Sequence, residues 1–142
     1  MSTTVNAAEQ SKHVVQSIYD AVRTGNIEAF LALASDDMVL VEADSLAVGG
    51  TYEGRDAVLG CIGALAEHYD WSTLDVQVLI AEGEWVAAQV LVMATGPDRL
   101  QINISEWWRV RDGKAIECRP YYLDTEVMNR TLAANASARS AK

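Results

Sequence analysis

Residues 100–122 read LQINISEWWRVRDGKAIECRPYY, and this stretch decides how the chain folds. From Leu100 to Arg111 apolar and polar side chains alternate strictly, which is typical of a β-strand with one buried face. Asp112-Gly113 then predicts a tight hairpin turn, and Lys114 begins the strand that returns. The stretch therefore predicts two neighbouring antiparallel strands.

One acidic residue lies on the apolar side of this alternation. Glu106 falls between Ile104 and Trp108, where the pattern predicts buried side chains. A buried carboxylate has to find a partner, reach water in a cavity or take up a proton. Glu106 is therefore a candidate acid with a raised pKa in an apolar pocket. The alternative is a structural acid that a neighbouring hydroxyl, arginine or water satisfies.

Helical patterns precede the strands along the chain. A helix is predicted from Ser11 to Gly25, a short one after Asn26, and a third over Arg55–His68. A short strand is predicted at Val39–Glu42 and a loop from there to Gly54. Period-two patterns predict four strands after Tyr69, and their inward residues include Leu74, Val76, Val78, Ile80, Ile116 and Cys118. A short helix starts at Asp124 or Thr125.

This order predicts an α+β fold in which helices cover one face of a curved, mainly antiparallel sheet. We expect a flexible N-terminus at residues 1–10, a single domain at 11–132 and a flexible tail at 133–142. A sheet that curls around helices leaves an open end, and such openings are common ligand sites.

Composition excludes several classes of function. The chain has 142 residues and a net charge of −9, with too few clustered basic residues for a nucleic-acid surface. It contains neither a run of about 20 apolar residues nor a signal peptide, so we expect a cytoplasmic protein with no membrane contact. Cys61 and Cys118 should be reduced, and His13 and His68 should lie on the surface. We expect neither a metal nor a cofactor.

The chain resembles the nuclear transport factor 2-like superfamily, which includes ketosteroid isomerases and SnoaL-like polyketide cyclases. Three stretches carry the resemblance: VVQSIYDAVRTGNIEAFLALASDDMVLVEA (Val14–Ala43), YEGRDAV (Tyr52–Val58) and EWWRVRDGKAIECRPYYLDTE (Glu106–Glu126). The resemblance covers about residues 11–132 and implies a conical fold with three N-terminal helices and a short C-terminal helix. It indicates the fold more strongly than the reaction, because this fold supports many functions.

The resemblance also suggests roles for two acids. Glu42 falls at the position of the isomerase's general base, and Glu106 falls at the position of its protonated acid, the residue that binds the oxyanion. Glu42 could instead be a solvated acid where a strand meets a loop. The isomerase's helix tyrosine falls on Ile18, and Tyr19 lies one position later, about 100° around the helix. This departure argues against steroid isomerisation itself.

A second family pattern fits less well. Limonene epoxide hydrolases need an aspartate where this chain has Pro120. Proline cannot activate water, which disfavours that chemistry. Further candidates for the pocket wall are Trp108 and Tyr122, and Tyr19 and Tyr52 are candidates to supply hydroxyls to a ligand.

The outward side of the predicted sheet is apolar and aromatic. It carries Trp85, Leu91, Met93, Trp107 and Tyr121. Because such a patch is too large to leave exposed, we expect a homodimer through this face, with Glu117 and Arg119 as a cross-strand or cross-interface ion pair.

These observations favour a small enzyme that uses acid/base catalysis on a small hydrophobic molecule with a carbonyl group. The reaction would be an isomerisation, a dehydration or a cyclisation. Two alternatives remain: a non-catalytic domain that binds a small molecule in the same pocket, and a dimerisation module in which Glu106 is internally paired.

Overall fold

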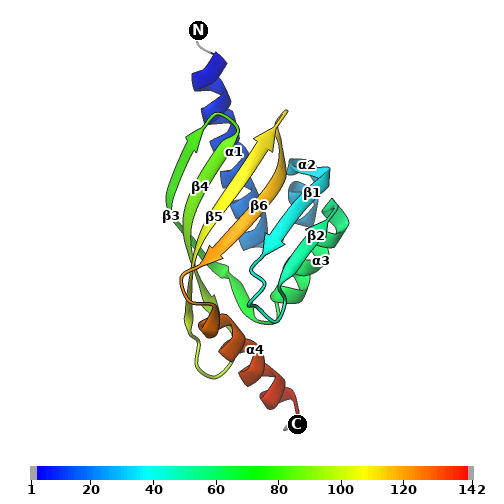
Figure 1. Ribbon diagram of the computed structural model, residues 1–142, viewed down its shortest axis with the longest axis vertical. Helices are drawn as coiled ribbons and strands as arrows, with labels where there is room; N and C mark the ends of the chain where they lie inside the picture. Colours follow the sequence, from blue (N-terminus) through cyan, green and yellow to red (C-terminus); the bar gives the residue numbers. More distant parts are fainter. Residues whose placement is uncertain (1–2, 141–142) are drawn as a thin grey trace.

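A six-stranded mixed sheet bends around the first helix (Figure 1). The computed structural model describes residues 3–140, and the side chains of residues 7–138. Its elements are α1 (Thr3–Thr24), α2 (Ile27–Leu33), β1 (Ala34–Glu42), β2 (Gly50–Glu53), α3 (Arg55–Leu65), β3 (Tyr69–Glu82), β4 (Trp85–Ala94), β5 (Gln101–Arg111), β6 (Lys114–Tyr122) and α4 (Thr125–Ser140).

The strands lie in the order β2-β1-β6-β5-β4-β3. All neighbours are antiparallel except β1 and β6, which run parallel. Helix α1 packs against β3, β4 and β5, while α3 packs against β1 and β2. The predicted α+β class is confirmed. The predicted hairpin is also confirmed, because Asp112 and Gly113 have φ angles of 52° and 76° between β5 and β6.

The first two helices follow the predicted signals. In α1, Val14, Val15 and Ile18 form a buried stripe. Gly25 ends the helix with a φ of 68°, and the Asn26 side chain accepts a hydrogen bond from the amide of Ala29 at 3.1 Å. In the part of the chain that the structure describes, no helix is both long and apolar enough to span a membrane.

Alternation places the core on the concave side of the sheet. On β4 the side chains of Val86, Ala88, Val90 and Val92 are almost fully buried. On β5, Glu106 lies in register with Ala88 of β4 and Pro120 of β6. The carboxyl group therefore belongs to the inner face, as its place in the alternation predicts.

Two irregularities reverse the predicted direction of side chains. On β3 the register shifts between Val76 and Val78, so Val78 pairs with Gln89 on the outer face. Val78 and Ile80 are 51% and 61% exposed, and their predicted inward orientation is wrong.

The second irregularity lies on β6. Val110 pairs with Ala115 and Arg109 with Glu117, which leaves Ile116 as the extra residue of a bulge. Ala115 takes the buried position, and Ile116 lines a hollow on the opposite side with Val39 and Val41 of β1, among others. The prediction that Ile116 points inward is wrong for this reason.

Several element boundaries also differ from the prediction. Helix α1 begins earlier, at Thr3, and α4 continues through the predicted tail to Ser140. Strand β1 starts at Ala34, and β2 forms inside the predicted loop by pairing Gly50–Glu53 with the end of β1. Helix α3 follows both strands and ends at Leu65.

His68 is buried and does not have the predicted surface position. Its Nδ1 lies 3.0 Å from the side-chain amide of Asn135, which connects α4 to the end of α3. The Asn135 amide also donates to the hydroxyl of Thr95 at 3.3 Å. These contacts hold α4 against the end of the sheet.

Candidate functional site

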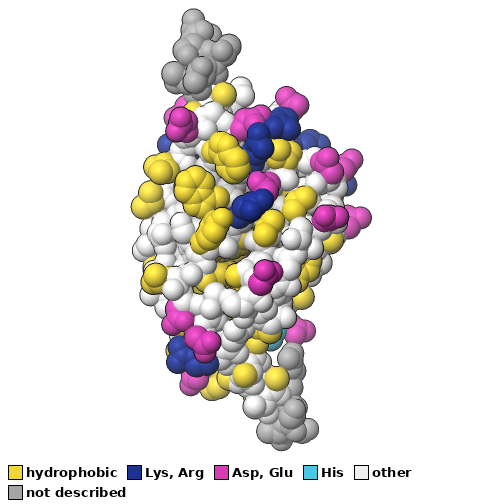
Figure 2. Space-filling view, in the orientation of Figure 1, with side chains coloured by type: hydrophobic (Ala, Val, Ile, Leu, Met, Phe, Trp, Pro, Cys, Tyr) yellow, Lys and Arg dark blue, Asp and Glu magenta, His cyan; other side chains and the backbone are white. Residues whose placement is uncertain are grey.

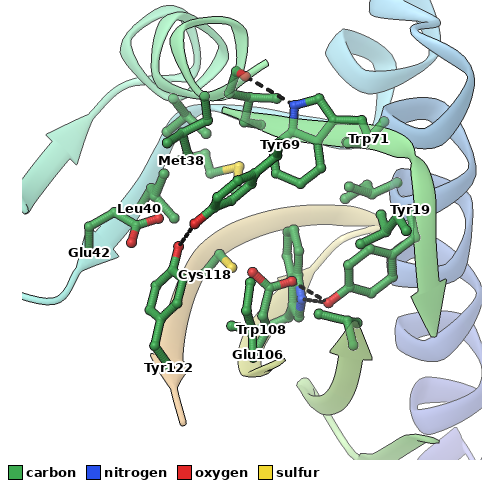
Figure 3. A pocket seen from close by; sticks show the side chains of 18 residues that line it. Tyr19, Met38, Leu40, Glu42, Tyr69, Trp71, Glu106, Trp108, Cys118 and Tyr122 are labelled. Atoms are coloured by element: carbon green, nitrogen blue, oxygen red, sulfur yellow. Dashed lines mark hydrogen bonds between the residues drawn. The ribbon is translucent and has the colours of Figure 1, made fainter. Parts of the chain in front are cut away.

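The concave side of the sheet encloses a cavity of about 60 Å³, which has room for a few water molecules (Figure 3). Helices α1 and α3 and strands β1, β3, β4, β5 and β6 contribute to its wall. The wall is largely apolar. Its ionisable groups are Tyr19, Glu42, Tyr69, Glu106, Cys118 and Tyr122, and none of the described lining residues is Lys, Arg or His.

Glu106 lies at one side of the cavity and is held by a chain of two hydrogen bonds. The Tyr19 hydroxyl donates to Glu106 Oε1 at 2.6 Å, and the Trp108 indole N–H donates to the Tyr19 hydroxyl at 2.8 Å. The rings of Tyr19 and Trp108 also meet edge to face, 5.6 Å apart. This chain fixes one oxygen of Glu106 and leaves the other for the cavity.

Tyr19 therefore faces the pocket although it lies one position after the residue that aligns with the isomerase's tyrosine. Ile18 and Tyr19 are both buried and both line the cavity, because α1 lies against the concave face of the sheet and also contacts α2. A helix enclosed on several sides can present neighbouring residues to the same cavity.

Glu42 ends β1 at the other side of the cavity. Only 3% of the residue is exposed, and its Oε2 has no hydrogen-bond partner among the described residues. The alternative of a solvated acid is therefore wrong for Glu42. In Figure 3 its carboxyl group points inward, toward the hydroxyls of Tyr69 and Tyr122. A buried carboxyl oxygen without a partner is costly, and such groups commonly mark functional sites.

Tyr69 and Tyr122 form a second pair of hydroxyls, beside Glu42. Tyr69 donates to the Tyr122 hydroxyl at 2.9 Å. Tyr69 is almost fully buried and packs edge to face on Trp71, with ring centres 4.9 Å apart. Because Tyr122 accepts from Tyr69, its own proton is available for another acceptor.

Sequence reasoning missed Tyr69, which sits where a helical pattern gives way to alternation. The available signal is the helical spacing of Tyr69 with Val58, Ile62 and Leu65, which predicts an inward side chain, whereas the alternation of β3 counted back from Leu74 predicts an outward one. The register shift between Asp70 and Asp75 removes that constraint and turns Tyr69 inward.

Burial shifts the pKa values of both acids. Desolvation raises the pKa of Glu106 from its ordinary 4.5 to about 7, although the Tyr19 hydrogen bond opposes the shift. Desolvation also raises the pKa of Glu42 to about 7; the charge of Glu106 adds to this rise, and the Tyr122 hydroxyl opposes it. Near neutral pH the pair can therefore hold one proton and one negative charge.

One predicted site residue lies elsewhere. The Tyr52 hydroxyl donates to the backbone carbonyl of Val48 at 2.7 Å, and Tyr52 is not part of the described cavity wall. The structure thus brings together five of the six predicted residues, namely Tyr19, Glu42, Glu106, Trp108 and Tyr122. Cys118 joins the wall as a buried thiol whose pKa is raised by burial.

A cone of helices packed inside a curved sheet is the architecture of the nuclear transport factor 2-like superfamily. The family model described as the SnoaL-like domain matches residues 15–118, and the chain belongs to this family. The predicted resemblance is confirmed. None of the functionally curated proteins matches the chain in sequence.

Solved structures show the same fold. Bal32a, from a soil-derived mobile gene cassette, has a TM-score of 0.80 at 18% identity, covering 88% of this chain and 98% of that chain. A nuclear transport factor 2-like protein from Burkholderia xenovorans LB400 has a TM-score of 0.73 at 18% identity, covering 87% of this chain and 96% of that chain. A candidate ketosteroid isomerase from Kribbella flavida DSM 17836 has a TM-score of 0.74 at 18% identity, covering 87% of this chain and 83% of that chain.

Proposed function

We propose that the protein is a cofactor-free acid/base catalyst that acts on a small hydrophobic molecule with a carbonyl group. The observation that carries this proposal is the pair of carboxyl groups in one largely apolar cavity, Glu42, which is buried, and Glu106, which is partly buried. Each acid is costly to bury, and both pKa values lie near the pH at which an acid and a base work together.

In the proposed mechanism Glu42 is the base. Its carboxylate removes a proton from the carbon next to the substrate carbonyl, and the C–H electrons form a C=C bond while the carbonyl π electrons move to oxygen. Protonated Glu106 donates its proton to that oxygen, so an enol forms. Where a C=C bond adjoins the enol, protonated Glu42 returns the proton to the far carbon of that bond, the enol proton returns to Glu106, and the carbonyl re-forms, which gives isomerisation. Where a hydroxyl group lies on the next carbon, it takes the proton from Glu42 and leaves as water while the enol proton returns to Glu106, which gives dehydration. Attack of the enol carbon on a second carbonyl gives cyclisation.

The surrounding hydrogen bonds support this division of roles. Tyr19, oriented by Trp108, occupies Oε1 of Glu106, which leaves Oε2 to carry the proton that faces the cavity. The Tyr122 hydroxyl opposes the rise in the pKa of Glu42 and so favours its ionised form. Trp108 and Tyr122 would also contact the substrate through their rings.

Deuterium exchange tests the proposal without knowledge of the natural substrate. In D₂O the protein should accelerate exchange of the methyl protons of small aromatic ketones such as acetophenone, as followed by proton NMR. Glu42→Gln should lower this rate by at least about 100-fold, the usual contribution of a general base. Glu106→Gln should also lose rate while it keeps ketone affinity.

The matched control is Glu53→Gln, which removes an exposed carboxylate from neighbouring β2 and should leave the rate unchanged. Exchange no faster than in buffer across the ketone series would reject catalysis of this kind. Ligand binding without exchange would instead favour the alternative, a non-catalytic domain that binds a small molecule in the same pocket.

The outer face of the sheet supports a homodimer as part of this proposal. Figure 2 shows hydrophobic side chains gathered over β3, β4 and β5 on this face. Trp85, Trp107 and Tyr121 are between 40% and 56% exposed, and Leu91 and Met93 are partly exposed beside them. The bulge on β3 adds Val78 and Ile80 to this apolar face. Contiguous exposed apolar patches commonly mark protein–protein interfaces.

Two smaller features bear on the same proposal. Glu117 and Arg119 form the expected ion pair, at 2.9 Å, but within β6 itself, so its predicted cross-strand placement is wrong. A pairing of the two residues across an interface stays a prediction. Cys61 and Cys118 are free buried thiols, which supports a reducing compartment such as the cytoplasm as the place where the protein works.

A further inference from the structure

The polar groups of the cavity carry an unbalanced charge. The wall holds two carboxyl groups, and none of the described residues that line it is a lysine, an arginine or a histidine. An ionised Glu42 or Glu106 therefore meets hydroxyl and thiol groups, but no cation, inside the cavity. A ligand that enters the cavity should therefore not add to this negative charge.

One carboxyl oxygen of Glu42 also lacks a hydrogen-bond donor, although the Tyr122 hydroxyl serves the carboxyl group as a whole. Its Oε2 is buried and has no partner among the described residues, while Oε1 of Glu106 is already occupied by Tyr19. The Glu42 side chain lines the cavity and points into it (Figure 3). An O–H or N–H group on a ligand would satisfy this oxygen, whereas a carboxylate or phosphate would bring a second set of acceptors beside it.

We infer that the cavity selects uncharged molecules that carry a hydroxyl or N–H donor for Glu42, and that it rejects carboxylates and phosphates. The inference rests on the proposed function in that it concerns the same cavity, but it describes binding and not turnover. It narrows the substrate from any small carbonyl compound to an uncharged one with a donor group, such as a hydroxyketone.

Repulsion of anions depends on the ionisation of groups that surround Glu42. The ionisable groups are Tyr19 on α1, Tyr52 on β2, Cys61 on α3, Tyr69 on β3, Glu106 on β5, and Cys118 and Tyr122 on β6. Strand β4 contributes only the apolar Val90 to the cavity wall. Burial raises the pKa values of the phenols and thiols, so these stay neutral near pH 7. The two glutamates alone therefore set the charge of the cavity.

Three ligands that share one aromatic ring test the inference: benzyl alcohol as the uncharged donor, anisole as an ether without a donor, and benzoate as the anion. Dissociation constants are measured by NMR titration of the whole protein. Benzyl alcohol should bind at least about tenfold more tightly than benzoate and several-fold more tightly than anisole, because only the alcohol satisfies Glu42 without adding charge. Equal binding of alcohol and benzoate, or no binding of the alcohol, overturns the inference.

The wild-type protein gives a second test that needs no variant. Benzoate stays ionised between about pH 5.5 and about pH 8.5, whereas the glutamates lose their protons across this range. The preference for benzyl alcohol over benzoate should therefore grow several-fold with rising pH. A constant preference would count against the inference even if the alcohol bound well.

Variants then assign the effect to Glu42. Glu42→Gln should reduce the preference for benzyl alcohol over benzoate to a few-fold. The control Glu53→Gln, which removes the same charge from the exposed surface, should leave this preference unchanged. An unchanged preference in Glu42→Gln overturns the role of Glu42. Selective binding without deuterium exchange leaves this inference standing and rejects only the catalytic proposal, so the two failures are distinguishable.

Discussion

At the scale of single residues, Glu106 shows what the alternation of apolar and polar residues can predict and what it cannot. Strict alternation around it predicted an inward carboxyl group, and the structure has one. The partner of that carboxyl could not be predicted, because Tyr19 lies 87 positions away on a helix whose rotation the sequence does not fix. Local periodicity predicts which face a residue takes, while the contact across the cavity depends on how the helix packs.

Tyr19→Phe should raise the pKa of Glu106 above about 7. The hydroxyl of Tyr19 is the one group that opposes the effect of burial on this carboxyl. The change also removes the acceptor of the Trp108 indole N–H, so it should cost about 1–3 kcal/mol of stability. Carboxyl-carbon NMR titration measures the shift. Tyr121→Phe on the outer face is the control, and an equal shift in both variants would contradict this account.

At the scale of elements, bulges limit what alternation can predict. On β4 and β5 the pairing is regular, and the predicted inward apolar residues of these two strands are buried. On β3 and β6 one extra residue reverses the sides, as Val78 and Ile116 show. A bulge depends on the partner strand, so period-two counting along one strand cannot reveal it. The same limit hid β2, whose four residues form a strand only beside β1.

The outward-pointing side chains that follow the bulge on β3 lead to a prediction about assembly. Ile80→Lys should weaken the proposed dimer, because Ile80 is 61% exposed on the apolar outer face and a buried lysine without a partner is costly. Sedimentation velocity at micromolar concentration measures the change. Ile27→Lys is a matched control, since Ile27 is 57% exposed on α2, away from this face. Identical sedimentation of the two variants and the wild type would argue against this interface.

Substitution of two glycines by alanine tests whether the contact between Gly96 and the Asn135 side chain helps to hold α4. Gly96 has a φ of 95°, and a Cβ there would overlap the side-chain oxygen of Asn135. Gly96→Ala should therefore destabilise the protein by about 1–2 kcal/mol. Gly60 lies inside α3 with nothing within 4 Å of an added Cβ, so Gly60→Ala should stabilise it by about 0.5–1 kcal/mol. Urea unfolding measures both, and equal effects would show that α4 does not depend on this contact.

At the scale of the whole molecule, the SnoaL-like domain family accounts for the fold but leaves the chemistry open. The stretches that carry the resemblance supply part of α1, all of α2 and β1, and the β5–β6 hairpin from Glu106 onward. The family model extends the match to residues 15–118. The departures fall at the site: Ile18 where the isomerase pattern has tyrosine, and Pro120 in register with Glu106. Core packing tolerates many sequences, whereas a reaction depends on a few atoms, so the fold is easier to predict than the function.

The two raised pKa values also make global stability depend on pH. Between about 4.5 and about 7 the folded protein binds more protons than the unfolded chain, so the free energy of unfolding is highest below this range and falls as pH rises through it. The carboxylates with lowered pKa, such as Asp37, Asp70 and Glu84, act in the opposite direction but only at lower pH.

Glu106→Gln should remove part of this dependence. Glutamine keeps an acceptor for Tyr19 but cannot ionise, so the variant should be more stable than the wild type at about pH 8, by roughly 1–3 kcal/mol, and about equal to it at about pH 5. Urea unfolding at both pH values measures the difference, with Glu53→Gln as the control that should show none. Equal stability of wild type and Glu106→Gln at the higher pH would mean that Glu106 ionises there without cost. In that case Glu106 could not serve as a neutral proton donor. A more stable Glu106→Gln variant would instead show that the protein retains an acid in its cavity that its fold does not require.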